Sequence, residues 1–172
     1  MARLVTVRGF TPQISKDVFL APEAVLIGDI QIAEGSSVWY FVTIRGDVMP
    51  IRIGREVNIQ DNSVIHGTYG KCGTTIGDRT TIGHQVTLHG CEIGQECLIG
   101  MGSVIMDKAV IGQRSIVGAG SLVTEGTIIP PGSLAMGRPA KVIRLLNEKE
   151  IESLQHSADN YLLYKTWYTD GG

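Results

Sequence analysis

The sequence has no uninterrupted run of about 18 apolar residues, so no membrane-spanning helix is expected. Its first eight residues also lack the apolar stretch of a secretory signal peptide. Cysteine is scarce, because the chain has only Cys72, Cys91 and Cys97, and these form no C-x-x-C pair. An odd number of cysteines without a signal peptide favours a cytoplasmic protein with reduced thiols.

A strong charge of either sign is also absent, since 15 basic residues oppose 17 acidic ones. No basic stripe is present, which argues against binding to nucleic acid. Apolar residues make up 43% of the chain and charged residues 19%, which supports a packed core. Glycine, in contrast, is abundant at 22 of 172 residues, compared with a usual share of roughly 7%. Glycine spread through an aliphatic sequence indicates regular turns and an internal repeat.

Aliphatic residues recur at every sixth position along most of the chain. Four series keep this spacing, namely Leu20 to Ile44, Ile53 to Ile65, Ile76 to Leu88 and Ile93 to Ile129, with a weak end at Ala135. A period of six is too short for a helical repeat and is a signature of the parallel β-helix. Three hexapeptides close a triangular coil of about 18 residues, in which the aliphatic side chains point inward and stack between coils. Glycine after the aliphatic residue is predicted to let the chain bend at the corners.

The predicted fold is an all-β solenoid, a parallel β-helix of hexapeptide repeats, with a C-terminal helix. Residues 1–140 are expected to form the β-helix domain, and residues 141–172 a helical segment that packs on the coil. Asn147 is placed to cap this helix and Glu150 to complete a capping box. The helix is predicted to pack along the outer face of the coil or to cover its bare end, where strand edges would be exposed.

The six-residue spacing breaks at three places, and breaks in a solenoid usually mark loops on one face. The intervals are nine residues from Ile44 to Ile53, eleven from Ile65 to Ile76 and five from Leu88 to Ile93. The eleven-residue interval is either two hexapeptides less one residue or one hexapeptide with a five-residue bulge. Its glycines and polar residues favour the bulge.

Three histidines occur near these breaks. With the bulge, His66 and His89 occupy the same repeat position on one face, one coil apart and about 5 Å from each other. His84 falls on a different face, from which it can reach the other two only across a threefold interface. Three imidazoles with an open fourth position suit a catalytic zinc, iron, cobalt or nickel ion. Solvation on the coil surface is the alternative for the three histidines, which cluster within 24 positions, and spacing alone leaves both interpretations open.

Polar residues in neighbouring coils flank the histidines. Arg45 joins the column of His66 and His89 one coil earlier. Asp47 and Asp61 are candidates to orient the histidines by hydrogen bonding, because metal-bound imidazoles usually need such partners.

This combination of residues resembles the γ-class carbonic anhydrase family, and above all its compact bacterial members. The resemblance runs from about Phe10 into the C-terminal helix and rests on Arg45-Gly46-Asp47, Asn58-Ile59-Gln60-Asp61, His66, His84, His89 and Gly137-Arg138-Pro139-Ala140-Lys141. It implies a left-handed coil and a homotrimer. It also implies a lyase that reversibly hydrates carbon dioxide to bicarbonate, using hydroxide generated on zinc, or on iron or cobalt in its place.

The resemblance assigns His66, His84 and His89 as the metal ligands, with His84 contributed by the adjacent subunit. It places Arg45 near the metal.

The catalytic candidates that the resemblance implies are Arg45, Gln60 and Asp61. Arg45 would pair with Asp47 and Asp61 across the interface and help to hold bicarbonate, and Gln60 would bind the metal-bound water or the substrate. Tyr161, in the C-terminal helix, is the further candidate for substrate binding, with core packing as its alternative role.

The chain departs from the best-characterised γ pattern at two places. Val48 stands where that pattern has a glutamate directly after Arg-Gly-Asp, and the loop from Thr68 to Thr75 lacks the acid that shuttles protons. Proton release often limits turnover, so the alternative is a metal-binding homotrimer with little hydratase activity or a hydrolase of unidentified substrate. A hexapeptide acyltransferase, with one histidine as general base, is less favoured because three histidines cluster. Cys72 lies in the same loop and could respond to redox conditions.

Overall fold

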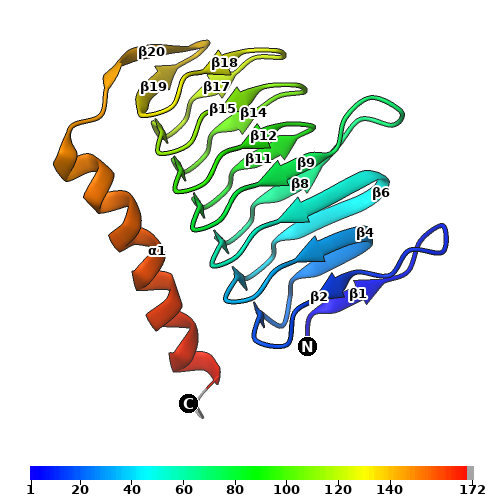
Figure 1. Cartoon of the computed structure of the whole chain (residues 1–172). Coiled ribbons are helices and arrows are strands. Elements are labelled where there is room, and N and C mark those ends of the chain that lie inside the picture. The colour runs from blue at the N-terminus through cyan, green and yellow to red at the C-terminus, as the bar shows by residue number, and fades with distance from the viewer. Residues whose placement is uncertain (170–172) are drawn as a thin grey trace.

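The structure is a computed structural model that describes residues 1–169. Its chain winds into a triangular solenoid, and one long helix returns alongside it (Figure 1). The last three residues of the predicted segment 141–172 lie outside the described residues. No helix within residues 1–169 combines the length and the apolar character needed to cross a membrane.

The strands lie on three faces, and neighbouring coils pair in parallel. Face one contains β1 (Arg3–Val5), β4 (Val25–Ile32), β6 (Thr43–Ile53), β8 (Val64–His66), β11 (Thr87–His89), β14 (Val104–Ile105) and β17 (Leu122–Val123). Face two contains β2 (Gln13–Ile14), β9 (Thr74–Ile76), β12 (Glu92–Ile93), β15 (Val110–Ile111) and β18 (Ile128–Ile129). Because β4 and β6 continue around the corner, these two faces form one 12-stranded sheet.

Face three is a separate 8-stranded sheet. It contains β3 (Phe19–Leu20), β5 (Ser37–Val38), β7 (Asn58–Ile59), β10 (Thr81–Ile82), β13 (Leu98–Ile99), β16 (Ile116–Val117), β19 (Ser133–Gly137) and β20 (Ala140–Leu145). The last strand, β20, is antiparallel to β19 and closes the C-terminal end of this sheet. The predicted helical segment therefore begins with a strand, and the helix follows it.

The aliphatic series stack in the predicted register. On face one, Ile44 pairs with Ile65, and Ile65 with Leu88. On face two, Ile53 pairs with Ile76. The eleven-residue interval therefore spans one step from face one to face two, which confirms the predicted bulge.

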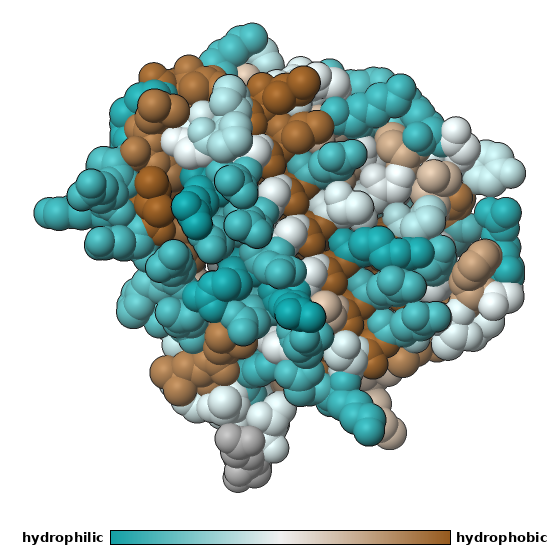
Figure 2. Space-filling view, viewed as in Figure 1, coloured by the Kyte–Doolittle hydropathy of each residue, from teal (hydrophilic) through white to brown (hydrophobic). Residues whose placement is uncertain are grey.

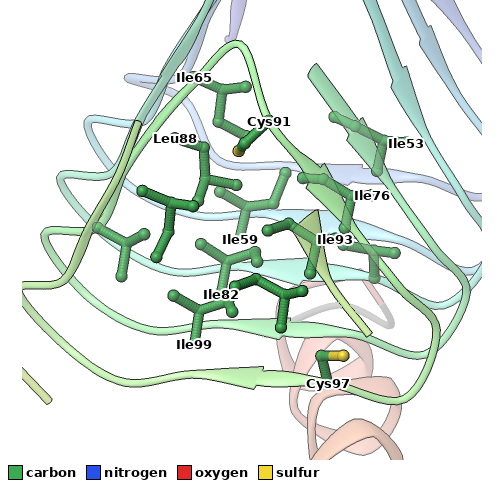
Figure 3. Packing of buried hydrophobic residues seen from close by; sticks show 14 of the residues in the cluster. Ile53, Ile59, Ile65, Ile76, Ile82, Leu88, Cys91, Ile93, Cys97 and Ile99 are labelled. Carbon is green, nitrogen blue, oxygen red and sulfur yellow. The ribbon is translucent and has the colours of Figure 1, made fainter. Parts of the chain in front are cut away.

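These side chains fill one core along the axis of the coil (Figure 3). Ile59, Ile82 and Ile99 are fully buried, and burial of one such side chain stabilises the fold by roughly 1.5–3 kcal/mol. Cys91 and Cys97 are also buried in this core, and burial raises the pKa of their thiols to about 12 and about 11. All three cysteines are free, as predicted.

The corners of the coil turn at the third residue after the inward aliphatic one. Arg79 and Glu96 adopt left-handed backbone angles there, with φ of 55° and 54°. Gly94, directly after an inward isoleucine, is not among these left-handed residues, so the prediction that such glycines bend the chain is wrong. Gly94 instead allows two neighbouring coils to stack closely, since a Cβ atom there would lie 2.5 Å from the backbone nitrogen of Gln113.

The same glycines leave part of the core visible from outside. Shallow grooves on face two are lined by residues such as Ile53, Gly54, Ile76 and Gly77. Figure 2 shows an apolar stripe that runs along the length of the coil.

Helix α1 (Glu148–Thr169) starts with the predicted capping box. The Glu150 backbone N–H donates to Asn147 Oδ1 at 3.0 Å, and the Asn147 backbone N–H donates to Glu150 Oε2 at 2.9 Å. Arg144 holds both oxygens of Glu150 at 2.7 Å. The strand–helix junction is thus fixed by hydrogen bonds from both sides.

The helix packs along the outer face of the coil, one of the two predicted arrangements (Figure 1). Leu154 and Ala158 are buried against the coil. Arg79 donates to Asp159 at 2.7 Å, and Lys165 donates to the carbonyl oxygen of Gly35 at 2.9 Å. These contacts hold α1 beside β5 and β10 of face three.

Candidate metal centre

Two histidines lie next to each other on face one. His66 ends β8, His89 ends β11, and the two are partners in the parallel register of these strands. Their ring centroids are 5.3 Å apart, and the ring planes meet at 62°. Both follow an inward aliphatic residue, so their imidazoles point outward from the coil.

Arg45 and Asp47 surround His66. The Arg45 guanidinium bonds Asp47 Oδ2 at 2.5 Å and lies 3.4 Å from His66 Nδ1. His66 Nε2 lies 3.0 Å from Asp47 Oδ1. Burial raises the pKa of Asp47, but hydrogen bonds from Arg45 and His66 outweigh it and hold the pKa below its usual value. Arg45 thus pairs with Asp47 within one chain, whereas the predicted pairing was across an interface.

The partner of His89 is Asp107, which was not among the residues predicted from the sequence. His89 Nδ1 lies 2.6 Å from Asp107 Oδ1, while Thr68 Oγ1 donates to Asp107 Oδ2 at 2.7 Å. Lys71 Nζ lies 3.1 Å from the same Oδ2 atom. Burial raises the pKa of Asp107, whose side chain is 9% exposed, but these donors lower it well below its usual value.

The sequence signal that could have located Asp107 is the glycine at the equivalent position of the adjacent coil. Asp107 and Gly90 both come two residues after an inward residue of face one, in adjacent coils. A Cβ atom at Gly90 would lie 2.9 Å from Asp107 Oδ1. The absence of a side chain at Gly90 therefore gives this carboxylate room to reach His89.

His84 lies apart from this pair, just after β10 on face three. Its Nδ1 atom is 2.9 Å from Asp61 Oδ2, and 44% of its side chain is exposed. Gln60 is buried next to it, and its Nε2 donates to Asn58 Oδ1 at 3.1 Å. Gln60, His84 and Met101 contribute to a groove of about 320 Å³ on this face.

Tyr161 belongs to the same side of the molecule. It reaches from α1 to the Trp39 ring at 5.5 Å, and together with Asp61 it lines a cleft of about 250 Å³. Burial, with the charge of Asp61, raises the pKa of Tyr161 to about 12. Its phenol therefore stays protonated near neutral pH.

The predicted site residues, together with Asp107, thus form two groups. The face-one half contains Arg45, Asp47, His66, His89 and Asp107, and the face-three half contains Gln60, Asp61, His84 and Tyr161. Within residues 1–169 of a single chain, no group of three or more His, Cys, Asp or Glu side chains is placed to hold a metal ion. One chain therefore presents two separate halves of the predicted site.

The chain is similar to known proteins along almost its whole length. It is 45% identical over 166 residues to the carbonic anhydrase of Geobacillus kaustophilus, which covers 94% of this chain and 88% of that protein. It is 43% identical over 164 residues to the Arabidopsis thaliana protein named gamma carbonic anhydrase 2, mitochondrial. This second match covers 92% of the chain but only 59% of the plant protein. Residues 90–125 match the family described as bacterial transferase hexapeptide (six repeats).

The chain belongs to the γ-class carbonic anhydrase family. Its architecture is the parallel β-helix predicted from the hexapeptide repeat, with the left-handed coil that the family resemblance implies. A solved structure described as a putative acetyltransferase from Bacillus cereus superposes with a TM-score of 0.96 at 40% identity, covering 98% of both chains. The γ-class carbonic anhydrase fold thus has close relatives that are described as acyl-transfer proteins.

The two histidine groups of this γ-class carbonic anhydrase chain fit the donor set of a metal site. His84 and His89 each direct Nδ1 at a carboxylate, which leaves Nε2 as the ligand atom. His66 uses Nε2 for Asp47 and faces Arg45 with Nδ1, so it must give up one of these contacts to bind a metal ion.

The two departures from the γ pattern occupy different surroundings. Val48 is partly buried and lines a cleft of about 200 Å³ with Arg8 and Phe10. The acid-free loop contacts acidic residues of other coils, since its Lys71 lies 3.1 Å from Asp107 and 2.7 Å from Glu125.

Cys72 in this loop packs beside Gly90, where a Cβ atom would lie 2.5 Å from the sulfur. Its redox role stays a prediction.

Proposed function

We propose that this protein is a metal-dependent carbonic anhydrase that assembles as a homotrimer and interconverts carbon dioxide and bicarbonate. The observation that carries the proposal is the placement of the three histidines, each of which has a carboxylate at hydrogen-bond distance. Two occupy one face and the third another. Membership of the γ-class family supports the same assignment.

In the assembled site, His66 and His89 of one subunit and His84 of the next would hold the metal. Asp61 and Asp107 accept the Nδ1–H of their histidines and so direct each Nε2 lone pair outward. Zinc, or iron or cobalt in its place, supplies a Lewis acid that makes water nucleophilic near neutral pH.

Arg45 and Gln60 are suited to the substrate. The Arg45 side chain is 43% exposed beside His66, and its guanidinium can donate to an anionic oxygen of bicarbonate. The Gln60 amide is oriented by Asn58, and its Oε1 receives no hydrogen bond from residues 1–169. That oxygen can accept a hydrogen bond from water. Face three of a neighbour would bring Gln60 toward Arg45.

Metal analysis and stopped-flow carbon dioxide hydration test the proposal. The purified wild-type protein should contain about one metal ion per subunit, and His89→Ala should lose it. His156→Ala, an exposed position on α1, is the matched control and should keep both metal and activity. Full metal retention by His89→Ala, or a wild-type protein that is monomeric and metal-free, would contradict the proposal.

A metal-binding homotrimer with little turnover is the second candidate, and the acid-free loop favours it. Lys71 of this loop pairs with Asp107 and Glu125. The loop therefore carries a cation at the place where the proton transfer of this reaction needs an acceptor. Val48→Glu tests this by adding an acid next to Asp47. A rise in hydration rate identifies proton release as the limiting step, whereas wild-type rates already typical of this family exclude the candidate.

The hydrolase and acyltransferase alternatives are tested on the same preparation. The close structural match to the putative acetyltransferase of Bacillus cereus motivates the second of these. Turnover of acetyl-CoA by metal-free protein would favour acyl transfer. Metal-dependent hydrolysis of esters without hydration of carbon dioxide would favour a hydrolase.

A further inference from the structure

The loop from Gly67 to Gly73, named the site loop, lies beside the face-one half and contacts its Asp107. It begins directly after His66 and closes on itself through the Thr68 backbone N–H, which donates to the Cys72 carbonyl at 3.0 Å. Figure 1 shows it projecting from the corner between β8 and β9. Within residues 1–169, no hydrogen bond or ion pair joins a side chain of this loop to an imidazole ring, and the link to the histidines runs through another group.

Asp107 is that group, because its two oxygens have different partners. Oδ1 lies 2.6 Å from His89 Nδ1. Oδ2 accepts a hydrogen bond from Thr68 Oγ1 at 2.7 Å and lies 3.1 Å from Lys71 Nζ. A carboxylate is planar and rigid, so turning it to follow the loop also moves Oδ1 away from His89. The side chain has little space for independent movement, since it is 9% exposed.

The backbone ties the same parts together. Thr74, which follows the site loop, donates its hydroxyl to the His66 carbonyl at 2.7 Å. Its oxygen also accepts the Gly90 N–H at 3.0 Å. Both ends of the site loop are therefore anchored between the residues that present His66 and His89. Between these anchors, side chains of the loop contact Asp107 and Glu125, and the Tyr69 ring lies 5.7 Å from the Arg8 guanidinium.

We propose that Asp107 is a positioning residue that couples the order of the site loop to the orientation of His89, so that loop order and metal affinity change together. This inference rests on the proposed metal site. Coupling of two events is reciprocal: if an ordered loop favours metal binding, bound metal favours an ordered loop by the same factor.

Thr68→Val and Lys71→Met test the coupling on the whole protein, because they remove loop donors without touching a histidine. Cobalt(II) is the probe, titrated into metal-free protein and followed by its visible absorption. Each variant should raise the cobalt Kd about fivefold or more, and Asp107→Asn should raise it about 10- to 100-fold. Glu152→Gln, an exposed position on α1 away from the site loop, is the matched control and should leave the Kd unchanged.

Amide hydrogen exchange of residues 67–73 provides the reciprocal measurement. Cobalt(II) should slow exchange there in the wild type and have little effect in Asp107→Asn. Unchanged Kd, cobalt spectrum and loop exchange in Thr68→Val and Lys71→Met overturn the coupling, even where their melting temperatures fall, since that pattern means a purely structural role. A wild-type protein that binds no cobalt overturns the proposed function together with this inference.

Discussion

His66 and His89 are register partners in adjacent parallel strands, with ring centroids 5.3 Å apart. Their separation follows from the spacing of the coils, because equivalent positions in neighbouring strands lie about 4.8 Å apart. The backbone position of each histidine is set by its strand. The pair is therefore built into the sheet, and the third imidazole has to come from elsewhere.

Mixing two inactive variants tests where the third imidazole comes from. His84→Ala and His89→Ala should each lose the metal. In mixed trimers, an intact pair on one chain can meet an intact His84 on the next, so random mixing should restore about a quarter of the sites. Metal content after joint refolding measures this. No restoration, with trimers formed, contradicts a shared site.

Two glycine substitutions separate coil stacking from corner geometry. Gly94→Ala places a Cβ atom 2.5 Å from the Gln113 backbone nitrogen, so the coils must separate at a cost of about 3 kcal/mol or more. Gly120→Ala has open space but a left-handed φ of 68°, which costs about 1–2 kcal/mol. Urea unfolding of both variants gives the comparison. Equal effects would mean that stacking imposes no extra constraint at Gly94.

The capping box should make stability depend on pH in the acid range. Hydrogen bonds from Arg144 and then from the Asn147 backbone lower the pKa of Glu150 from 4.5 to about 2. A carboxyl whose pKa is lower in the folded state stabilises the fold fully above about pH 4.5, and this contribution is lost as pH falls through about 2. The stability difference between wild type and Glu150→Gln should therefore be present at pH 7 and shrink below pH 4.5.

Urea midpoints between pH 7 and pH 3 measure this difference. Glu152→Gln, an exposed position on the same helix, is the control and should show no such dependence. A Glu150→Gln effect that is constant with pH contradicts the assignment.

Tyr161→Phe distinguishes substrate binding from packing. The variant keeps the edge contact with Trp39 at 5.5 Å, so the free energy of unfolding should change by less than about 0.5 kcal/mol. Under the proposed function, loss of the protonated hydroxyl should raise the KM for bicarbonate about two- to tenfold, the value of one hydrogen bond. A loss of stability with unchanged KM would assign Tyr161 to the core alone.

The repeat made most of the fold predictable, because the six-residue period fixes which side chains point inward. Once the bulge after Ile65 is recognised, counting alone places His66 and His89 in one column. The capping box was equally local, since Asn147 and Glu150 are three residues apart. Both patterns depend only on the spacing of residues along the chain, which the sequence gives directly.

Asp107 could not be found by the same reasoning. It lies 18 residues from His89, and its contact with the ring depends on the missing side chain at Gly90 and on the fold of the site loop. Strand β20 was missed because its pairing with β19 is antiparallel and follows no hexapeptide pattern. The pairing of Arg45 with Asp47 within one chain depends on rotamers that spacing does not determine.

The length of helix α1 matches the height of the stacked coils. Its 22 residues span about 33 Å, which equals the height of roughly seven stacked coils. It starts beyond the last coil and ends with Tyr168 against Phe19 and Trp39 near the first. Duplicating one coil would shift these rings by about 4.8 Å and separate them. The number of coils in this chain can therefore change only if the helix changes length with it.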